Sequence, residues 1–430
     1  MKKLNSLIKG TLILTVAGFL SRIIGFFYRI FLSHTIGAEG IGIYQMVFPV
    51  FAISFSITGA GIQTAISKFV AARRDRKLSF FLSGLSVSLL LSAMMSCLLY
   101  ECSDRIALSF LMEERTAPLI RILALSIPFE SIHCCVNGYC LGLKKAGFPS
   151  ATQLIEQTIR VSSVFAIYYY IISHHMTPSV SVAVIGIVFG EFAAMIVSVC
   201  FMLREFLQNS VLRLELCHDM KTILRFSAPL SCNRLVLNFL ASMEATHIPN
   251  SLRHYGLSNV DALSTYGVLT GMALPMIFFP AAVTNSISVM LLPEIAEADA
   301  KQNTTHIRYA VNKTIRYCFC LGLICTAAFL LTADFAGRIL FKNALAGPYI
   351  RALCFICPLI YMGGPLTSIL HGLGKTTRAF FINLTCLALR LSFVLFAIPL
   401  MGIKGYFLGL LVSEIADILL ILFSLRKYLR

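Results

Sequence analysis

The chain consists of long apolar segments joined by short polar ones. A helix of roughly 20 apolar residues crosses the hydrocarbon core of a bilayer, and the joining segments are too short to form a domain of their own. We expect membrane-spanning helices in the segments 9–32, 41–66, 78–100, 117–141, 149–172, 180–204, 219–244, 262–292, 310–332, 347–371, 379–399 and 402–425. The hydrophobic pattern therefore predicts an all-α membrane protein with about twelve transmembrane helices.

The composition agrees with this prediction. The 430 residues are 57% hydrophobic and only 13% charged, which leaves too little polar surface for a soluble protein of this length. The net charge of +16 does not indicate nucleic-acid binding, because the basic residues lie in short connections between apolar segments. Most of them fall on the side that carries the N-terminus, and basic loops remain in the cytoplasm. We predict that both termini are cytoplasmic and that nucleic acid is not a partner.

The two halves of the sequence resemble each other. Residues 118–162 align without a gap with residues 348–392. Identical positions that hydrophobicity alone would not match are Pro118 and Pro348, Arg121 and Arg351, Pro128 and Pro358, and Arg160 and Arg390. Six spans per half give both halves the same orientation, so the repeat is parallel and a pathway is expected between the halves. The sequence predicts two six-helix lobes, 1–208 and 209–430, around a central cavity.

Several arginines lie inside the predicted spans, where each charge costs roughly 3 kcal/mol on insertion scales. They are Arg22, Arg29, Arg160, Arg234 and Arg390. Arg22 and Arg234 are repeat mates on the first helix of each lobe, within stripes of small and polar residues at spacings of three and four. Asn238 belongs to the second stripe. We expect Arg22, Arg29, Arg234 and Asn238 to line a hydrated cavity and bind substrate. The alternatives are polar contacts between helices and, for Arg29, a place at the membrane interface.

Two roles are open to Arg160 and Arg390, namely substrate binding and ion pairing. Glu156 lies one turn before Arg160 on the same helical face and can neutralise it. Cys386 takes the matching place before Arg390, which must find its acid elsewhere.

Acidic residues inside the spans are candidates for ion coupling or ion pairing. They are Glu130, Glu156, Glu191, Glu244, Glu414 and Asp417, and Glu191 has Glu414 as its repeat mate. Glu244 is expected near the outer surface. A proton or Na⁺ is the expected coupling ion, and none of these acids stands out as its site.

A cavity lined by arginine selects anions. The guanidinium group is a planar fork that matches phosphate or carboxylate and stays charged in a low dielectric. We therefore expect an anionic head group, either soluble or attached to a membrane lipid. The sequence lacks a phosphate loop, an HExxH motif and a nucleophile elbow, so neither enzymatic activity nor a cofactor is predicted. Cys354 and Cys357 have metal-site spacing but lie inside a span without a second pair, so no metal site is predicted.

Two N-terminal motifs give the chain a family resemblance. They are Ser21-Arg22-Ile23-Ile24-Gly25-Phe26 followed by Arg29, and Ile36-Gly37-Ala38-Glu39-Gly40-Ile41-Gly42-Ile43-Tyr44-Gln45. With Glu156-Gln157 before Arg160, the chain resembles the stage V sporulation protein B and polysaccharide-exporter branch of the multidrug/oligosaccharidyl-lipid/polysaccharide flippase superfamily. The lipid II flippase belongs to a sister branch. The twelve-span, two-lobe layout extends the resemblance over the whole chain.

The resemblance implies a flippase of the bacterial cytoplasmic membrane. Its cargo would be an oligosaccharide or peptidoglycan precursor linked to undecaprenyl pyrophosphate, moved by alternating access for polysaccharide, cell-wall or spore synthesis. It also implies that Arg22 and Arg234 line the cavity, as arginines on the first span of each lobe do in flippase relatives. Arg29 is displaced by one residue from the second arginine of the lipid II flippase, where this chain has Tyr28. We expect a monomer.

Two other transporter classes match the sequence less well. A cation-coupled multidrug exporter of the same superfamily should present acids to its cavity, whereas the first-span stripe here is basic. A major facilitator carrier usually has a glycine-containing basic loop after the second span, and residues 71–77 lack the glycines. The multidrug exporter is the alternative function.

Overall fold

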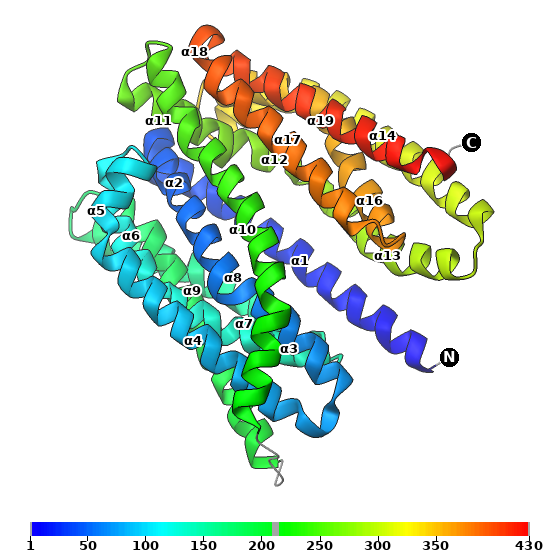
Figure 1. The fold of residues 1–430 in the computed structure, drawn as a ribbon. Helices are drawn as coiled ribbons and strands as arrows, with labels where there is room; N and C mark the ends of the chain where they lie inside the picture. The colour runs from blue at the N-terminus through cyan, green and yellow to red at the C-terminus, as the bar shows by residue number, and fades with distance from the viewer. Residues whose placement is uncertain (1, 209–214, 429–430) are drawn as a thin grey trace. The chain divides into compact units, whose positions relative to one another are not determined.

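The computed structural model describes residues 2–208 and 215–428, and every regular element in these ranges is helical (Figure 1). Longer helices alternate with short π- or 3₁₀-helical turns, which are labelled η. The predicted all-α fold is confirmed.

The chain forms two compact units, Met1–Tyr28 with Met46–Ser242 (unit 1) and Arg29–Gln45 with Met243–Arg430 (unit 2). Three long helices pass from one unit to the other, namely α1 (Lys2–Thr35), α2 (Gly37–Phe55) and α10 (Leu216–His254). The units therefore have bounds that differ from those of the predicted lobes. Residues 209–214 lie outside the described ranges, and the division into lobes 1–208 and 209–430 stays a prediction.

Unit 1 is built from the elements between α2 and α10. These are η1 (Ser56–Ala60), α3 (Gly61–Ala72), η2 (Arg74–Arg76), α4 (Lys77–Glu101), α5 (Ser103–Arg105), η3 (Ile106–Phe110), η4 (Glu114–Thr116), α6 (Ala117–Ala124), α7 (Ser126–Gly142), α8 (Gly147–Ser173) and α9 (Ser181–Gln208). Its core lies where α3, α4, α7 and α10 meet, and it contains Ile66, Phe81, Tyr139 and Ile223. Burial of these large side chains holds the four helices together.

Unit 2 is built from the elements after α10. These are α11 (Asn259–Gly267), η5 (Val268–Ala273), α12 (Leu274–Phe278), α13 (Ala281–Ala300), α14 (Thr304–Phe335), η6 (Ala336–Leu340), α15 (Ala346–Leu353), η7 (Cys354–Ile356), α16 (Cys357–Gly372), α17 (Thr376–Phe396), α18 (Ile398–Met401), α19 (Ile403–Leu425) and η8 (Arg426–Tyr428). Its core joins α13, α14, α16 and α19 through Ile295, Val311, Leu366 and Ile421.

The repeat seen in the sequence recurs in the order of these elements. A π-helical turn follows the second helix of the repeat in each unit, at η1 and η5, and another follows α5 at η3 and α14 at η6. In unit 1 α8 packs against α9, and in unit 2 α17 packs against α19. The two units therefore share an architecture as well as a sequence pattern.

The turn between α1 and α2 explains why residues 29–45 belong to unit 2. Gly37 adopts φ 69°, a left-handed conformation that glycine accepts without steric cost. Beyond the turn, a Cβ atom added to Gly42 would lie 2.2 Å from the carbonyl oxygen of Leu263, so α2 and α11 touch at backbone distance. His34 also contacts the Leu340 carbonyl oxygen at 2.7 Å.

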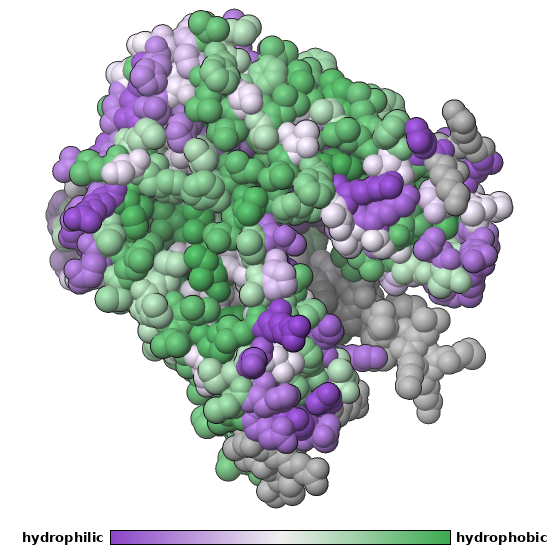
Figure 2. Space-filling view, in the orientation of Figure 1, coloured by the Kyte–Doolittle hydropathy of each residue, from purple (hydrophilic) through white to green (hydrophobic). Residues whose placement is uncertain are grey.

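The surface is that of a membrane protein. Nine helices in the described ranges are long and apolar enough to cross a membrane, or ten when the bent pair in 114–142 is counted as one span. The helices α8 and α10 are also long enough to cross a membrane, but their polar residues make them less hydrophobic than these nine. Figure 2 shows hydrophobic residues over most of the visible face, and large apolar side chains such as Tyr169, Leu331 and Leu400 are exposed. The chain is a multi-pass membrane protein.

Candidate functional site

The first two predicted anion-binding arginines, Arg22 on α1 and Arg234 on α10, belong to the same unit. Both side chains are exposed. In the part of the chain that the structure describes, Arg234 forms no hydrogen bond or ion pair. A cation on a membrane helix is stable only where water or an anion reaches it. Unit 1 therefore offers a guanidinium group that is available to a ligand.

Small and polar residues hold the middle of α10 against the α2–α3 helix of unit 1. A Cβ atom added to Gly61 would lie 2.2 Å from Ser231 Oγ, so the two helices approach closely. One turn beyond Arg234, the Nδ2 of Asn238 donates to Ser56 Oγ at 2.7 Å. The Asn238 amide thus takes part in a contact between helices, and its role in substrate binding stays a prediction.

Arg29 lies near the end of α1 and belongs to unit 2, where its side chain is half-buried. The structure therefore places it in a different unit from Arg22 and Arg234. Its predicted role in binding stays a prediction.

Five ionisable side chains, each buried or half-buried, form a group in unit 1 that we call the Arg160 cluster. It consists of Glu130, His133, Glu156, Arg160 and Glu191, from α7, α8 and α9. Arg160 forms an ion pair with Glu156, and its Nη2 lies 3.7 Å from Glu191 Oε1. His133 Nδ1 lies 3.0 Å from Glu191 Oε2. The local pair that the sequence suggested is present, and it is one part of a larger group.

The Arg160 cluster holds more acid than arginine. Glu130 is 6% exposed, and its Oε2 has no hydrogen-bond partner in the described ranges. Ligand atoms of His133, Glu156 and Glu191 lie within 4.8 Å of one another, close enough to share a metal ion, although Arg160 already pairs with Glu156. A buried carboxylate requires a partner, a proton or a cation. The cluster is therefore suited to taking up and releasing a proton or a monovalent cation.

Unit 2 contains the counterpart, the Arg390 cluster, made of Glu244, Arg390, Tyr406 and Glu414. Arg390 Nε donates to Glu244 Oε2 at 2.8 Å, and the Tyr406 hydroxyl donates to Oε1 of the same carboxylate at 3.1 Å. Arg390 Nη1 lies 4.0 Å from Glu414 Oε1. The helix α10 continues past Glu244 to His254 and the Glu244 side chain is buried, and its expected place near the outer surface stays a prediction. Glu244 is therefore the acidic partner of Arg390, which has Cys386 where Arg160 has Glu156.

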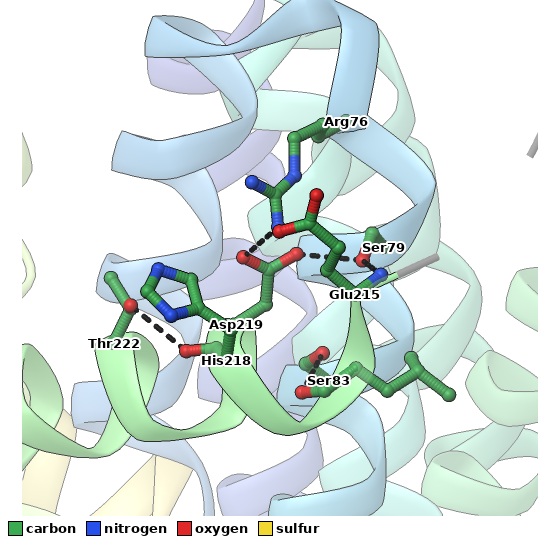
Figure 3. Close-up of polar contacts among 8 residues, drawn as sticks. Arg76, Ser79, Ser83, Glu215, His218, Asp219 and Thr222 are labelled. Carbon is green, nitrogen blue, oxygen red and sulfur yellow. Dashed lines mark hydrogen bonds and ion pairs between the residues drawn. The ribbon is translucent and has the colours of Figure 1, made fainter. Parts of the chain in front are cut away.

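A further polar cluster joins the start of α10 to the start of α4 (Figure 3). The fully buried Asp219 accepts hydrogen bonds from Arg76 Nη2 at 2.7 Å and from Ser79 Oγ at 2.6 Å. Arg76 also pairs with Glu215 at 2.7 Å. Asp219 lies in the first turn of α10, where a negative charge is favoured. The cluster fixes the start of the helix that carries Arg234, and no sequence pattern indicated it because its members are far apart in the chain.

Comparisons with known proteins agree on one family. Residues 7–254, more than half of the chain, match the family described as polysaccharide biosynthesis protein. Stage V sporulation protein B of Bacillus subtilis (strain 168) is 27% identical over 438 residues, covering 99% of this chain and 84% of that protein. Lipid II flippase MurJ of the same organism is 20% identical over 336 residues, covering 73% of this chain and 62% of the flippase.

Solved structures of the same fold are transporters. The lipid II flippase MurJ in an inward closed conformation has a TM-score of 0.76 at 14% identity, covering 96% of this chain and 87% of that chain. The MATE multidrug transporter DinF-BH has a TM-score of 0.73 at 17% identity, covering 98% of this chain and 95% of the other. The chain therefore has the fold of a two-lobe membrane transporter.

Proposed function

Because the chain belongs to the polysaccharide biosynthesis protein family, we propose that it is a flippase for a lipid-linked anionic saccharide in the bacterial cytoplasmic membrane. The proposed cargo is an oligosaccharide or peptidoglycan precursor linked to undecaprenyl pyrophosphate. The observation that carries the proposal is Arg234, a cation on a membrane helix with no acid partner in the described ranges, in the same unit as Arg22.

The chemistry of arginine supports an anionic head group. A guanidinium group binds phosphate through two parallel hydrogen bonds, and such charge-assisted bonds are about twice as strong as neutral ones. An arginine without an acid keeps this capacity for a ligand, whereas an arginine that is already paired does not. The prenyl tail would remain in the bilayer while the head group crosses by alternating access.

The predicted binding residues divide into two groups by their partners. Arg22, Arg29, Arg234 and Asn238 are proposed to contact the head group. Arg160 and Arg390 are already paired with acids, Glu156 and Glu244. This favours ion pairing over direct contact, and their binding role is retained only as a prediction.

The remaining proposals concern coupling and assembly. Glu130, Glu156 and Glu191 are proposed to bind the coupling ion, H⁺ or Na⁺, because their cluster has an excess of buried acid. The protein would act as a monomer with both termini in the cytoplasm, and it would translocate its cargo without catalysing a reaction.

The second candidate is a cation-coupled multidrug exporter. The same fold occurs in the MATE transporter DinF-BH, and the acid excess of the Arg160 cluster is compatible with cation coupling. The two candidates differ in cargo charge, since an exposed arginine attracts an anion and repels a cation.

Reconstitution into vesicles tests the proposal. The wild type should translocate a fluorescent polyprenyl-pyrophosphate saccharide and leave a cationic dye in place. Arg234→Ala should slow translocation by about tenfold to a hundredfold, because a charge-assisted hydrogen bond contributes about 1.5–3 kcal/mol. Arg234→Lys should recover part of the rate, because it restores the charge without the fork.

Arg225→Ala is the matched control, because Arg225 is an exposed arginine in an earlier turn of the same helix. It should leave translocation unchanged. Movement of the dye without movement of the saccharide lipid would instead establish the exporter.

A further inference from the structure

Unit 2 contains an open polar pocket that the proposed function does not use. Its volume is about 520 Å³, and it lies among α13, α16, α17 and α19. Its lining residues include Asn285, Ser288, Thr367, Asn383, Glu414 and Asp417. Three of the four helices, α16, α17 and α19, belong to apolar spans. Polar residues gathered at membrane depth usually serve a ligand or a pathway.

The sequence repeat explains why unit 2 has a pocket here. The alignment of 118–162 with 348–392 places Ile360 and Gly363 opposite Glu130 and His133. In unit 1 the His133 imidazole occupies this place and contacts Glu191. In unit 2 a glycine leaves the place open, and Glu414, the repeat mate of Glu191, lines the opening.

Two successive glycines keep the pocket open. A Cβ atom added to Gly363 would lie 3.2 Å from Asp417 Oδ2, and one added to Gly364 would lie 3.5 Å from Ser288 Oγ. The first approach is tight, and the second is ordinary van der Waals contact. A larger side chain at Gly364 would therefore extend into the pocket without first meeting backbone.

The size and chemistry of the pocket select one class of ligand. Small-molecule pockets usually measure about 300–1,000 Å³, whereas a water-sized ion needs roughly 30 Å³. In the described ranges the lining has two carboxylates, Glu414 and Asp417, one imidazole, His371, and neither lysine nor arginine, so it offers a phosphate no permanent positive charge. Carboxylates accept hydrogen bonds from neighbouring hydroxyl groups, and asparagine amides both donate and accept. This set of groups matches a ligand rich in hydroxyl groups.

We propose that this pocket binds the saccharide part of the cargo and determines its specificity. The inference rests on the proposed function, because it assigns the sugar of the same lipid-linked substrate. The pocket would recognise the hydroxyl groups of the saccharide through its carboxylate, amide and hydroxyl groups.

A binding measurement tests the pocket independently of transport. The chain has no Trp, so Ile360→Trp places a single fluorescent reporter in the pocket lining. Titration of this full-length variant in detergent with N,N′-diacetylchitobiose should give a saturable change in emission, and inorganic pyrophosphate should give none. Adding Gly364→Leu or Asn383→Leu should abolish the change in emission. Thr385 is an exposed residue of α17, the helix that carries Asn383, and adding Thr385→Val should preserve the change in emission. A response to Na⁺ alone, or none to the sugar, would overturn the proposal.

A transport measurement separates this inference from the proposed function. Vesicles would contain the saccharide-bearing lipid or the bare polyprenyl phosphate. Gly364→Leu should slow movement of the saccharide-bearing lipid by about tenfold, the effect of losing one neutral hydrogen bond. It should leave movement of the bare polyprenyl phosphate unchanged. If the wild type moves both lipids and Gly364→Leu alters neither rate, the inference fails and the proposed function stands. If the wild type moves neither lipid, the proposed function fails, and the fluorescence titration still decides whether the pocket binds sugar.

Discussion

The Arg160 and Arg390 clusters occupy matching places in the two units, yet they neutralise their arginines differently. Both arginines approach an acid on the last helix of the repeat, Glu191 at 3.7 Å and Glu414 at 4.0 Å. The closer partner differs. For Arg160 it is Glu156, one turn away on the same helix, and for Arg390 it is Glu244 on α10.

This difference separates the ion pairs that both units share from the ion pairs that are particular to one unit. The pair between the two neighbouring helices occurs in both units, so we assign it to the duplicated architecture. The local pair in unit 1 leaves Arg160 among surplus acids, which suits the exchange of an ion. The distant pair in unit 2 ties α17 to α10, which suits a structural role.

The largest effect is expected from Glu244→Gln. Glu244 is buried and accepts hydrogen bonds from both Arg390 and Tyr406. Although Glu414 stays 4.0 Å from Arg390, breaking this buried pair should cost about 3–5 kcal/mol. The Tyr406 hydroxyl would also lose its charged acceptor. Chemical unfolding of the purified protein in detergent measures the loss. Glu294→Gln is the control, because Glu294 forms an exposed pair with His306 of a kind that contributes about 0–1 kcal/mol. Equal losses in the two variants would remove the structural role of the Arg390 cluster.

A smaller effect is expected from Glu156→Gln. Glu156 is only half-buried, and Arg160 keeps Glu191 at 3.7 Å, so we expect a loss of about 1–2 kcal/mol, as for a hydrogen bond to a charged group. The double variant Glu156→Gln with Arg160→Gln measures the coupling between the two residues by a double-mutant cycle. A loss as large as that of Glu244→Gln would show that the two clusters do not differ in this respect.

The smallest effect on stability is expected from Glu130→Gln. The change preserves shape and removes no hydrogen bond at Oε2, so the free energy of unfolding should change by about 0.5 kcal/mol or less. If Glu130 takes part in ion coupling, transport in vesicles should lose its dependence on an imposed pH or Na⁺ gradient. Wild-type gradient dependence in this variant would exclude Glu130 from coupling.

The repeating part of the structure was predictable from the sequence. Hydrophobic segments predicted the helices, and identities between the halves paired Arg160 with Arg390 and Glu191 with Glu414. Periodicity also identified Glu156 as a partner of Arg160, because residues four apart share a helical face.

Contacts between distant segments were not predictable in the same way. Glu244 and Arg390, like Arg76 and Asp219, are brought together by packing that leaves no periodic signal. The length of α10 was also underestimated, because polar residues after Glu244 suggested a loop. His133 was overlooked because a single histidine in an apolar segment gives no indication of its neighbours.

The three helices that continue from one unit into the other have a mechanical consequence. The chain crosses between units within α1, α2 and α10, at Tyr28–Arg29, Gln45–Met46 and Ser242–Met243. At each crossing the backbone is helical and hydrogen-bonded from turn to turn, so it is stiffer than a loop. A bend or twist of one of these helices at its crossing is therefore resisted by its backbone hydrogen bonds. Pro49, which lacks a backbone N–H group inside α2 close to its crossing, is a natural pivot.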